Sequence, residues 1–470
     1  MSLTAQLQDV LGTDQVLVSA AAQAPYLEDW RGRYQGRAQA VVLPRSTDEV
    51  VQIVQCCQAA GIPIVPQGGN TGLCGGATPD ASGQAIVVAM TQLNRIRSID
   101  AINFSITAEA GATLDQLKAA AESVNRLYPL TLGAGHLSTL GGTLATNAGG
   151  LQVLRYGMTR ELCLGLEVVL PDGTLWSKLS PLRKDNTGYD LKQLFIGAEG
   201  TLGLITAATM KLMPLPAARA LIWLDVADAS RAIEAHALAQ TVFAGAQTAA
   251  ELISPTTLSL VRKHLPEAVL PAVAGDWPTG WALMMEVSAH DAEFLQALLA
   301  AWVRACNALK IPMGSLITTP DDQAAIWAIR KGLAESQKRE GISIKHDVGL
   351  PISLIPRFLS EASTALEARF PGIRIVAFGH VGDGNLHFNL SFAESHQNAL
   401  LIEQSLAANA VVYDIVSRLG GSIAAEHGIG QLKPAWLAQH APAGSIALMQ
   451  QIKAALDPQG LMNPGKVLVG

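Results

Sequence analysis

One short stretch of the chain concentrates side chains that could hold a metal ion or move a proton. Residues 380–389 read HVGDGNLHFN and follow an apolar run at 373–378 that predicts a strand. The central GDG is a turn signal, so we expect the chain to reverse there. The reversal would bring His380 and His387 together. Asn389, two positions further along the second strand, would share a face with His387.

A second stretch, AEHGIG at 425–430, places a carboxylate beside another imidazole. Two neutral imidazoles need at least one more ligand to form a catalytic metal site that stays open to substrate. Glu426 can supply that ligand, and His427 beside it can act as a general base. We therefore predict His380, His387 and Glu426 as ligands of a divalent metal, with Zn²⁺ as the expected ion. Spacing alone leaves open that these histidines only serve a glycine-rich turn or a core.

A glycine-rich loop, GGNTG at 68–72, could hold a phosphate group. It follows an expected strand at 62–66, which is preceded by a strand at 40–44 and by a helix that begins within 46–49 and runs to about residue 60. Successive glycines let backbone N–H groups converge on one anion. Alone, the loop is equally compatible with a plain turn. The dinucleotide fingerprint G-x-G-x-x-G does not occur, and a near match to a P-loop at 460–466 lacks the required hydroxyl residue.

Two further stretches rich in glycine, serine and threonine follow this loop, at 132–150 and 197–203. Small residues let a ligand approach the backbone closely. Three such stretches within one region suit an extended ligand that lies along the backbone, as a flavin dinucleotide would.

Composition limits the class of protein. The 470 residues exceed what one ordinary core needs and indicate two or three domains. With 49% hydrophobic and 15% charged residues, the chain is not disordered. A net charge of -6 without a basic run argues against nucleic-acid binding. Five scattered cysteines argue against a disulfide framework and against iron–sulfur ligation.

The expected location is the cytoplasm. The first residues lack the pattern of a signal peptide, and no apolar run reaches the roughly 18 residues of a membrane span. The sequence does not determine the oligomeric state, and a homodimer stays open.

The distribution of apolar runs, turn residues and helical stretches predicts three parts. They are a helical lead-in over 1–37, a mixed α+β domain over 38–216, and a second α+β domain over 217–470. Closely spaced prolines at 214 and 216 indicate the second boundary. Beyond it, alanine- and leucine-rich helices expected at 228–250, 291–310, 323–340 and 358–370 separate short strands.

The motifs resemble those of the vanillyl-alcohol-oxidase (PCMH-type) FAD-binding family. The likeness covers about 38–216 and rests on the loop at 68–72, TLGGTLATNAGG at 139–150, RYG at 155–157 and GAEGTLGLIT at 197–206. Through HVGDGNLHFN, AEHGIG and NPGK at 463–466, the remainder is similar to the C-terminal domain of FAD-linked D-2-hydroxyacid dehydrogenases. The resemblance implies an α+β fold in which the C-terminal domain is a cap with an antiparallel sheet.

The resemblance also implies that backbone contacts hold FAD. Asn70 stands where some members carry a flavin-linked histidine, so we expect non-covalent FAD. The residues assigned to the cofactor are Pro66, Gly68, Gly69, Asn70, Thr71, Gly72, Leu73, Gly133, Ser138, Thr139, Gly141, Gly142, Thr146, Asn147, Gly149, Gly150, Gly157, Glu199, Gly200, Gly203, Ile205 and Asn463.

For the substrate, the resemblance implies a D-2-hydroxy acid whose carboxylate is held by Arg330 and Lys345 and contacted by Asn389. It supports the metal ligands given above and His427 as the base. Members specific for D-2-hydroxyglutarate carry a hydroxyl residue where this chain has Ala334, so a D-lactate or glycolate dehydrogenase is an alternative. A non-catalytic flavin-binding subunit is a third. The expected electron acceptor is an electron-transfer flavoprotein or a quinone.

Overall fold

The computed structural model describes residues 2–469, and their contacts divide the chain into two units. The first unit contains the residues up to Gly150, Gly157–Leu215, and everything from Glu426 onward. The second contains Leu151–Tyr156 and Pro216–Ala425. The predicted α+β class is confirmed in both units, and the sheet of the second unit is antiparallel as expected.

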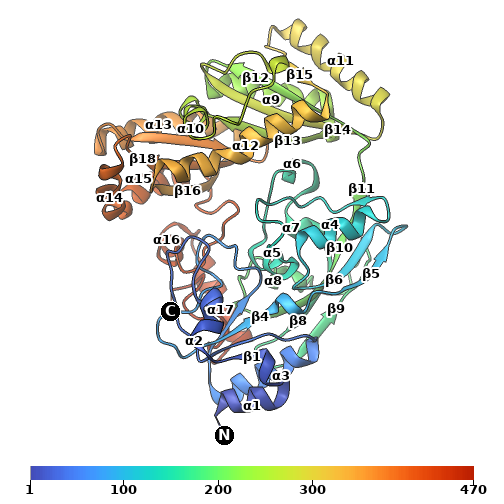
Figure 1. Cartoon of the computed structure of the whole chain (residues 1–470), viewed down its shortest axis with the longest axis vertical. Coiled ribbons are helices and arrows are strands. Elements are labelled where there is room, and N and C mark those ends of the chain that lie inside the picture. The colour runs from blue at the N-terminus through green and yellow to red at the C-terminus, as the bar shows by residue number, and fades with distance from the viewer. Residues whose placement is uncertain (1, 470) are drawn as a thin grey trace. The chain divides into compact units, whose positions relative to one another are not determined.

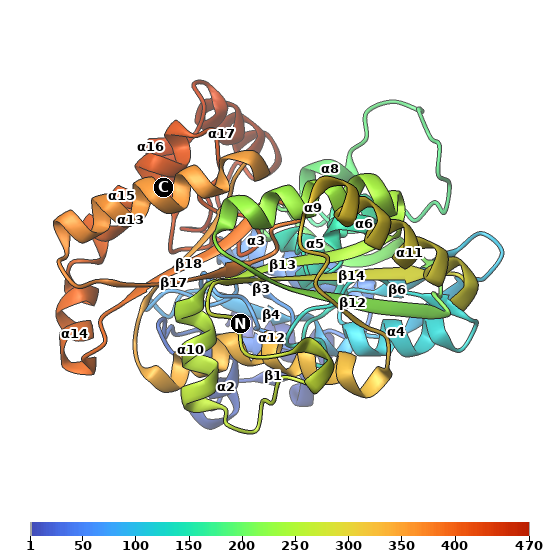
Figure 2. The same ribbon diagram turned by 90° about the horizontal axis from the view of Figure 1, so that it is seen from above.

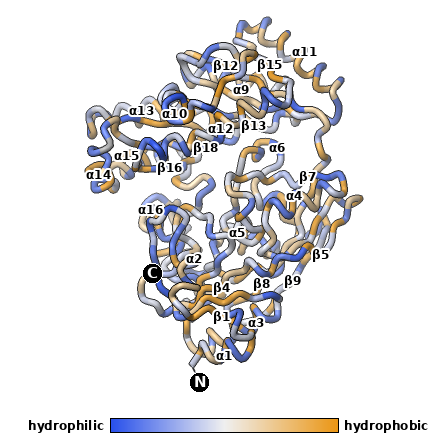
Figure 3. Tube along the Cα trace, viewed as in Figure 1, coloured by the Kyte–Doolittle hydropathy of each residue, from blue (hydrophilic) through white to orange (hydrophobic). Residues whose placement is uncertain are grey.

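The first unit opens with a four-stranded sheet whose order is β1 (Val16–Leu17), β2 (Ala40–Val42), β4 (Ile86–Ala89) and β3 (Ile64–Gln67). Strands β2, β4 and β3 are parallel and form a hydrophobic stripe in Figure 3, as expected for strands covered on both faces. The helices near this sheet are α1 (Leu3–Leu11), α2 (Ala20–Leu27) and α3 (Thr47–Ala60).

Helix α3, which precedes β3 and the glycine-rich segment, begins and ends at capping residues. The Ser46 side chain accepts a hydrogen bond from the backbone of Glu49 and begins α3. Gly61, at a φ of 64°, ends the helix in the left-handed region. The chain then enters β3 and reaches residues 68–72 at its C-terminal end.

A five-stranded antiparallel sheet forms the other half of the first unit (Figure 1), in the order β5 (Ile96–Asp100), β6 (Ser105–Glu109), β10 (Leu204–Lys211), β8 (Cys163–Val169) and β9 (Leu175–Lys178). A small ribbon pairs β7 (Arg126–Leu127) with β11 (Met213–Pro214). The remaining α-helices before Leu215 that belong to the first unit are α4 (Leu114–Glu122), α5 (Leu140–Thr146), α7 (Thr159–Leu162) and α8 (Lys192–Phe195).

By its contacts, the C-terminal segment from Glu426 onward groups with the first unit, whereas the predicted second domain runs continuously over 217–470. It carries α16 (Pro434–His440) and α17 (Ser445–Leu456). Its tail then runs along the outer edge of β3, where the Ile64 N–H donates to Leu461 and the Asn463 N–H donates to the Ile64 carbonyl, both at 2.8 Å. An edge strand offers unpaired backbone groups, and the tail satisfies them.

The residues of the predicted lead-in over 1–37 also group with the first unit by their contacts. Strand β1 pairs with β2, and α1 packs against α3. The expected boundary at 216 coincides with the division after Leu215.

The second unit is built on one seven-stranded antiparallel sheet, in the order β15 (Ser315–Ile317), β12 (Ala218–Val226), β14 (Trp281–Ala289), β13 (Gln247–Ile253), β17 (Arg374–Gly379), β18 (Asn385–Ser391) and β16 (Ile344–Gly349). Helices α9 (Ala229–Phe243) and α11 (Ala292–Leu309) lie on one face, and α10 (Pro255–His264) and α12 (Pro320–Glu340) lie on the other (Figure 2). The other helices are α6 (Val153–Tyr156), α13 (Ile355–Arg369), α14 (Ser395–Glu403) and α15 (Ser405–Arg418).

Within residues 2–469, no single helix is long and apolar enough to cross a membrane. Helices α14 and α15 reach that apolar length only as a pair, bent by 68°.

Candidate functional site

The glycine-rich loop of the first unit offers a row of backbone donors. The N–H groups of Gly69, Asn70, Thr71 and Gly72 donate to no other residue within 2–469. The Asn70 side chain turns away from this row and donates to the Glu28 carbonyl at 2.8 Å. Successive unpaired N–H groups form a concavity that suits an anion such as a pyrophosphate.

Two glycines of this loop are required by close packing. A Cβ on Gly68 would lie 2.4 Å from the Thr139 hydroxyl, and one on Gly69 would lie 1.8 Å from the Leu137 carbonyl. At Gly72, by contrast, a Cβ would meet nothing within 4 Å. The first two glycines therefore let two segments predicted for the cofactor lie side by side, while the third borders open space.

The second small-residue stretch is locked by short-range hydrogen bonds. Thr139 caps α5 by accepting from the Gly142 N–H at 3.3 Å, and Thr146 donates to the Gly142 carbonyl at 3.0 Å. Asn147 ends α5 in the left-handed region, at a φ of 48°. Ser138 lies 3.1 Å from the Thr71 hydroxyl, which ties this stretch to the loop at 68–72.

Glu199 and Asn463 form a clamp in the first unit. The buried Glu199 carboxylate accepts from the N–H groups of Ile429 and Gly430, at 2.7 and 2.8 Å. Burial raises the pKa of Glu199 despite these two donors. The Asn463 amide donates to the carbonyls of Gly76 and Glu199, at 2.9 and 2.8 Å.

These contacts refine two predicted roles. The Glu199 carboxylate accepts hydrogen bonds from the loop that follows His427. Its side chain therefore positions this loop, and any contact of Glu199 with the cofactor would come from its backbone. The buried Asn463 Oδ1 has no hydrogen-bond partner in the described part of the chain, which fits a residue that contacts a bound group. Every residue predicted for the cofactor belongs to the first unit.

The predicted hairpin of the second unit is present. Strands β17 and β18 pair antiparallel around the turn at 380–384, with Phe378 opposite His387. The imidazole rings of His380 and His387 lie 5.7 Å apart at nearly right angles. The sequence motif therefore brings the two predicted ligands together within one unit.

Each of these histidines lies beside a buried carboxylate that was not predicted. His380 Nδ1 is 2.5 Å from Glu251 on β13, and His387 Nδ1 is 3.9 Å from Asp347 on β16. Asn385 of the hairpin holds Asp347 by donating to its Oδ1 at 2.7 Å. A carboxylate hydrogen-bonded behind a ligating imidazole fixes the ring and its tautomer, and Glu251 is placed to do this for His380, whereas the 3.9 Å between His387 and Asp347 exceeds a hydrogen bond.

Glu251 is charged despite complete burial. Burial opposes its ionisation, but the charges and hydrogen bonds of Arg330 and His380 outweigh this effect and lower its pKa to about 2. The Arg330 Nε donates to Glu251 at 2.7 Å, and its guanidinium lies over the Phe378 ring at 5.4 Å. Because Nε is used in this way, the predicted carboxylate contact of Arg330 would fall to its terminal nitrogens.

The predicted substrate residues share one face of the sheet. Lys345 lies directly opposite Asn389 in the β16–β18 ladder. The Asn389 amide accepts from the His346 N–H at 3.2 Å and donates to Gln337 on α12 at 2.8 Å. Arg330 and Gln337, seven residues apart on α12, face this side of the sheet. Ala334 is exposed on the same helix.

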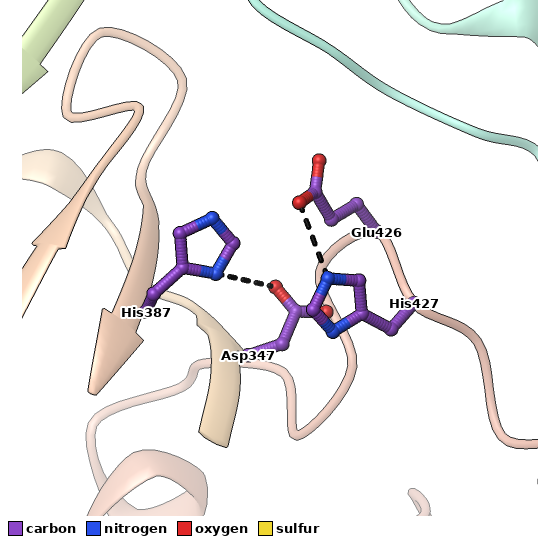
Figure 4. Close-up of side chains that lie close together, drawn as sticks. All are labelled: Asp347, His387, Glu426 and His427. Carbon is purple, nitrogen blue, oxygen red and sulfur yellow. Dashed lines mark ion pairs between the residues drawn. The ribbon is translucent and has the colours of Figure 1, made fainter. Parts of the chain in front are cut away.

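Figure 4 shows two close pairs, Asp347 with His387 and Glu426 with His427, where 3.4 Å separates the Glu426 oxygen and His427 Nε2. Glu426 and His427 follow a segment that is paired with β16, the edge strand of the seven-stranded sheet. Ser422 exchanges two backbone hydrogen bonds with Gly349, the last residue of β16, at 2.8 and 2.9 Å. Glu426 follows only four residues later.

The donor set fits a divalent metal. Because the Glu251 carboxylate can only accept, His380 must donate from Nδ1, and in the neutral form of the ring its Nε2 then presents a lone pair. Two imidazole nitrogens with a carboxylate oxygen are ligands that Zn²⁺ prefers. The unpaired backbone donors at 69–72 likewise fit the pyrophosphate of FAD.

Two family models match the chain. The model described as "FAD binding domain" matches residues 38–177, and the one described as "FAD linked oxidases, C-terminal domain" matches residues 215–467. The fold and these matches define the protein as a flavin-dependent oxidoreductase. The chain belongs to the PCMH-type FAD-linked oxidase family.

Relatives include a mitochondrial D-2-hydroxyglutarate dehydrogenase of Danio rerio, 35% identical over 94% of this chain and 80% of the relative. A D-2-hydroxyglutarate dehydrogenase of Xanthomonas citri is 35% identical over 94% of this chain and 92% of the relative. A chain named as a mitochondrial D-lactate dehydrogenase, from Schizosaccharomyces pombe, is 33% identical over 93% and 83%.

Among solved structures, p-cresol methylhydroxylase with bound substrate matches 99% of this chain and 96% of its own, with a TM-score of 0.77. Its sequence identity of 18% makes this a likeness of fold alone.

Proposed function

We propose that this flavoprotein oxidises a D-2-hydroxy acid, of which D-2-hydroxyglutarate is the first candidate, to the corresponding 2-oxo acid. The observation that carries the proposal is the β17–β18 hairpin, which sets His380 and His387 together, each beside a buried carboxylate. The names of several relatives favour the hydroxyglutarate substrate.

Glu426 is proposed as the third metal ligand. Ser422 is held to the end of β16, and Asp347 on the same strand pairs with His387. Four residues extend at most about 14 Å, so the chain at Glu426 stays within reach of the hairpin. Bound Zn²⁺ would supply a Lewis acid for the hydroxyl and carboxylate oxygens, and bound FAD would supply a hydride acceptor at N5.

The chain's own side chains carry the remaining work. His427 takes the proton of the 2-hydroxyl as the hydride leaves C2. The terminal nitrogens of Arg330 and the Lys345 ammonium hold substrate carboxylate. Asn389 contributes the second N–H of its amide, since its other N–H already serves Gln337. With Asn70 directed at Glu28, FAD is held without a covalent bond at this position. The proposed electron acceptor is an electron-transfer flavoprotein or a quinone.

A D-lactate or glycolate dehydrogenase is the second candidate, because Ala334 offers no hydroxyl one turn after Arg330. A spectrum of the purified, Zn²⁺-replete protein under anaerobic conditions tests both. We expect flavin absorbance that bleaches with D-2-hydroxyglutarate. Bleaching with D-lactate or glycolate instead would assign the second candidate. Flavin absorbance that persists with all three would refute the 2-hydroxyacid assignment and support a non-catalytic flavin-binding subunit.

A further inference from the structure

Glu251 occupies a central position in the second unit that no motif marks. It lies on β13, next to β17 in the seven-stranded sheet, with 0% of its surface exposed. One carboxylate oxygen accepts from Arg330 Nε at 2.7 Å, and the other lies 2.5 Å from His380 Nδ1. The two partners are 79 and 129 residues away along the chain.

The two partners have different proposed tasks, and the carboxylate constrains both. Its first oxygen holds Arg330 by the Nε–H and so sets where the terminal nitrogens of the guanidinium point. Its second oxygen requires His380 to carry a proton on Nδ1, and in the neutral ring, the form that binds a metal, this tautomer leaves the lone pair on Nε2. One buried anion therefore orients a metal ligand and a carboxylate-binding cation at the same time.

We propose that Glu251 is a positioning residue that couples the metal ligand His380 to the substrate-binding Arg330. The inference rests on the proposed function, because it takes His380 as a ligand and Arg330 as a carboxylate binder. It adds a residue that touches neither metal nor substrate yet controls the geometry of both contacts.

Only a carboxylate can fill this position. A glutamine has the same shape, but it offers one acceptor oxygen and one NH₂ donor. An NH₂ facing His380 would require Nδ1 to accept, and the proton would move to Nε2, where it blocks the metal. An NH₂ facing Arg330 would oppose two donors and displace the guanidinium. Either orientation breaks one of the two couplings.

The test compares Glu251→Gln with a matched control, Glu340→Gln. Glu340 also joins an arginine and a histidine, and additionally a lysine: its oxygens are 2.7 Å from Arg374 and 2.8 Å from Lys263, and it contacts His264. None of these partners is a predicted site residue. The probe is Zn²⁺, measured on the FAD-loaded full chain by competition with a chelator.

We expect E251Q to raise the dissociation constant for Zn²⁺ roughly 10- to 100-fold, the usual effect of losing a carboxylate behind a ligating histidine. E340Q should bind Zn²⁺ like the unaltered protein, although it is also expected to lower thermal stability. At saturating Zn²⁺, the KM of E251Q for the 2-hydroxy acid should remain raised, because Arg330 has lost the acceptor at its Nε. Glu251→Asp retains the charge on a shorter side chain. Its dissociation constant for Zn²⁺ should lie between those of the unaltered protein and E251Q.

His387→Gln separates failure of this inference from failure of the proposed function. If the unaltered protein binds no Zn²⁺, or H387Q binds it unchanged, the proposed metal site and the role of Glu251 both fall. If H387Q loses Zn²⁺ while E251Q keeps normal affinity, only the role of Glu251 is refuted. Should E251Q not fold, the ¹⁵N resonances of His380 in the metal-free, unaltered protein decide: a proton on Nδ1 supports the inference, and one on Nε2 overturns it.

Discussion

His427 lies beside Glu426, with 3.4 Å between its Nε2 and a carboxylate oxygen. As the proposed base, it should affect the chemical step more than binding. We expect His427→Gln to slow flavin reduction by the 2-hydroxy acid about 10²- to 10⁴-fold, which is the usual contribution of a positioned base. Stopped-flow absorbance of the flavin under anaerobic conditions measures this rate directly.

The control for this variant is His290→Gln, because the His290 side chain is 72% exposed and its ion pair is with the adjacent Asp291. It should leave the rate unchanged. Flavin content and bound Zn²⁺ should be equal in both variants. A rate for H427Q within the range of the control would remove His427 from the role of base.

Single residues differ in how far the sequence predicts them. The GDG turn between His380 and His387 has a local cause, so their proximity could be predicted and is confirmed. Glu251 could not be predicted, because its partners are distant along the chain and nothing in AAELI at 249–253 indicates a site. Asp347 could not be predicted for a related reason. It lies opposite His387 only because β16 pairs with β18 in this register, and the sequence does not reveal that register.

At the scale of elements, the turn between β17 and β18 depends on Gly384. Its φ is 86°, and a Cβ there would lie 2.2 Å from the Leu350 carbonyl. We expect Gly384→Ala to lower the free energy of unfolding by about 2 kcal/mol or more, from the left-handed strain together with the clash. Because the turn separates the two histidines, Zn²⁺ affinity should fall as well.

Gly372→Ala is the matched variant. Gly372 also has a positive φ, of 80°, but a Cβ there would meet nothing within 4 Å. Gly372→Ala should lower the free energy of unfolding only by the left-handed strain, about 1–2 kcal/mol, and should leave the affinity for Zn²⁺ unchanged. Urea unfolding and chelator competition check both variants, and equal Zn²⁺ affinities would show that the turn does not position the ligands.

Helices and strands with strong local signals were predictable. The helix over 47–60 has a serine cap and a terminal glycine, and α3 spans those residues. The helix expected over 228–250 was wrong at its C-terminal end, since α9 stops at Phe243 and β13 begins at Gln247. Every residue of β13 is buried between two other strands. A strand of this kind shows no alternation of apolar and polar residues, so periodicity does not reveal it.

At the scale of the whole molecule, Lys453 fastens the C-terminal segment within the first unit. Its ammonium donates to the carbonyls of Thr201 and Met462, both at 2.8 Å, and to the Asp457 carboxylate. Lys453→Met would remove the ammonium donor from the two buried carbonyls, at about 1–3 kcal/mol each, while the Asp457 carboxylate would keep the N–H groups of Leu461 and Met462 as donors. Because Met462 precedes Asn463, we expect weaker FAD binding and a lower FAD-dependent melting temperature.

Lys338→Met is the control, because Lys338 is exposed on α12 in the second unit. Fluorescence titration with FAD and thermal melts at several FAD concentrations measure both effects, since a ligand stabilises the state that binds it. Equal FAD affinity in K453M and K338M would show that the tail does not support the cofactor site.

Domain organisation was only partly predictable. The prolines at 214 and 216 lie on either side of the division that the contacts place after Leu215. The return of residues 426–470 to the first unit follows from backbone pairing with Ile64 on the edge of β3. Backbone groups are the same for every residue, so side-chain patterns carry no signal for this pairing.

The pairing of the C-terminal segment with β3 determines the order in which parts of the first unit can form during synthesis. The ribosome delivers the sheet edge at Ile64 almost four hundred residues before Met462, its partner in the bridge. Until then, the edge of β3 is unprotected and the Asn463 contacts with Gly76 and Glu199 cannot form. The residues of the second unit, all released earlier, are complete by Ala425. We therefore predict that stable capture of FAD is a late step, after release of the tail, and that the nascent chain needs protection of that edge against aggregation in the meantime.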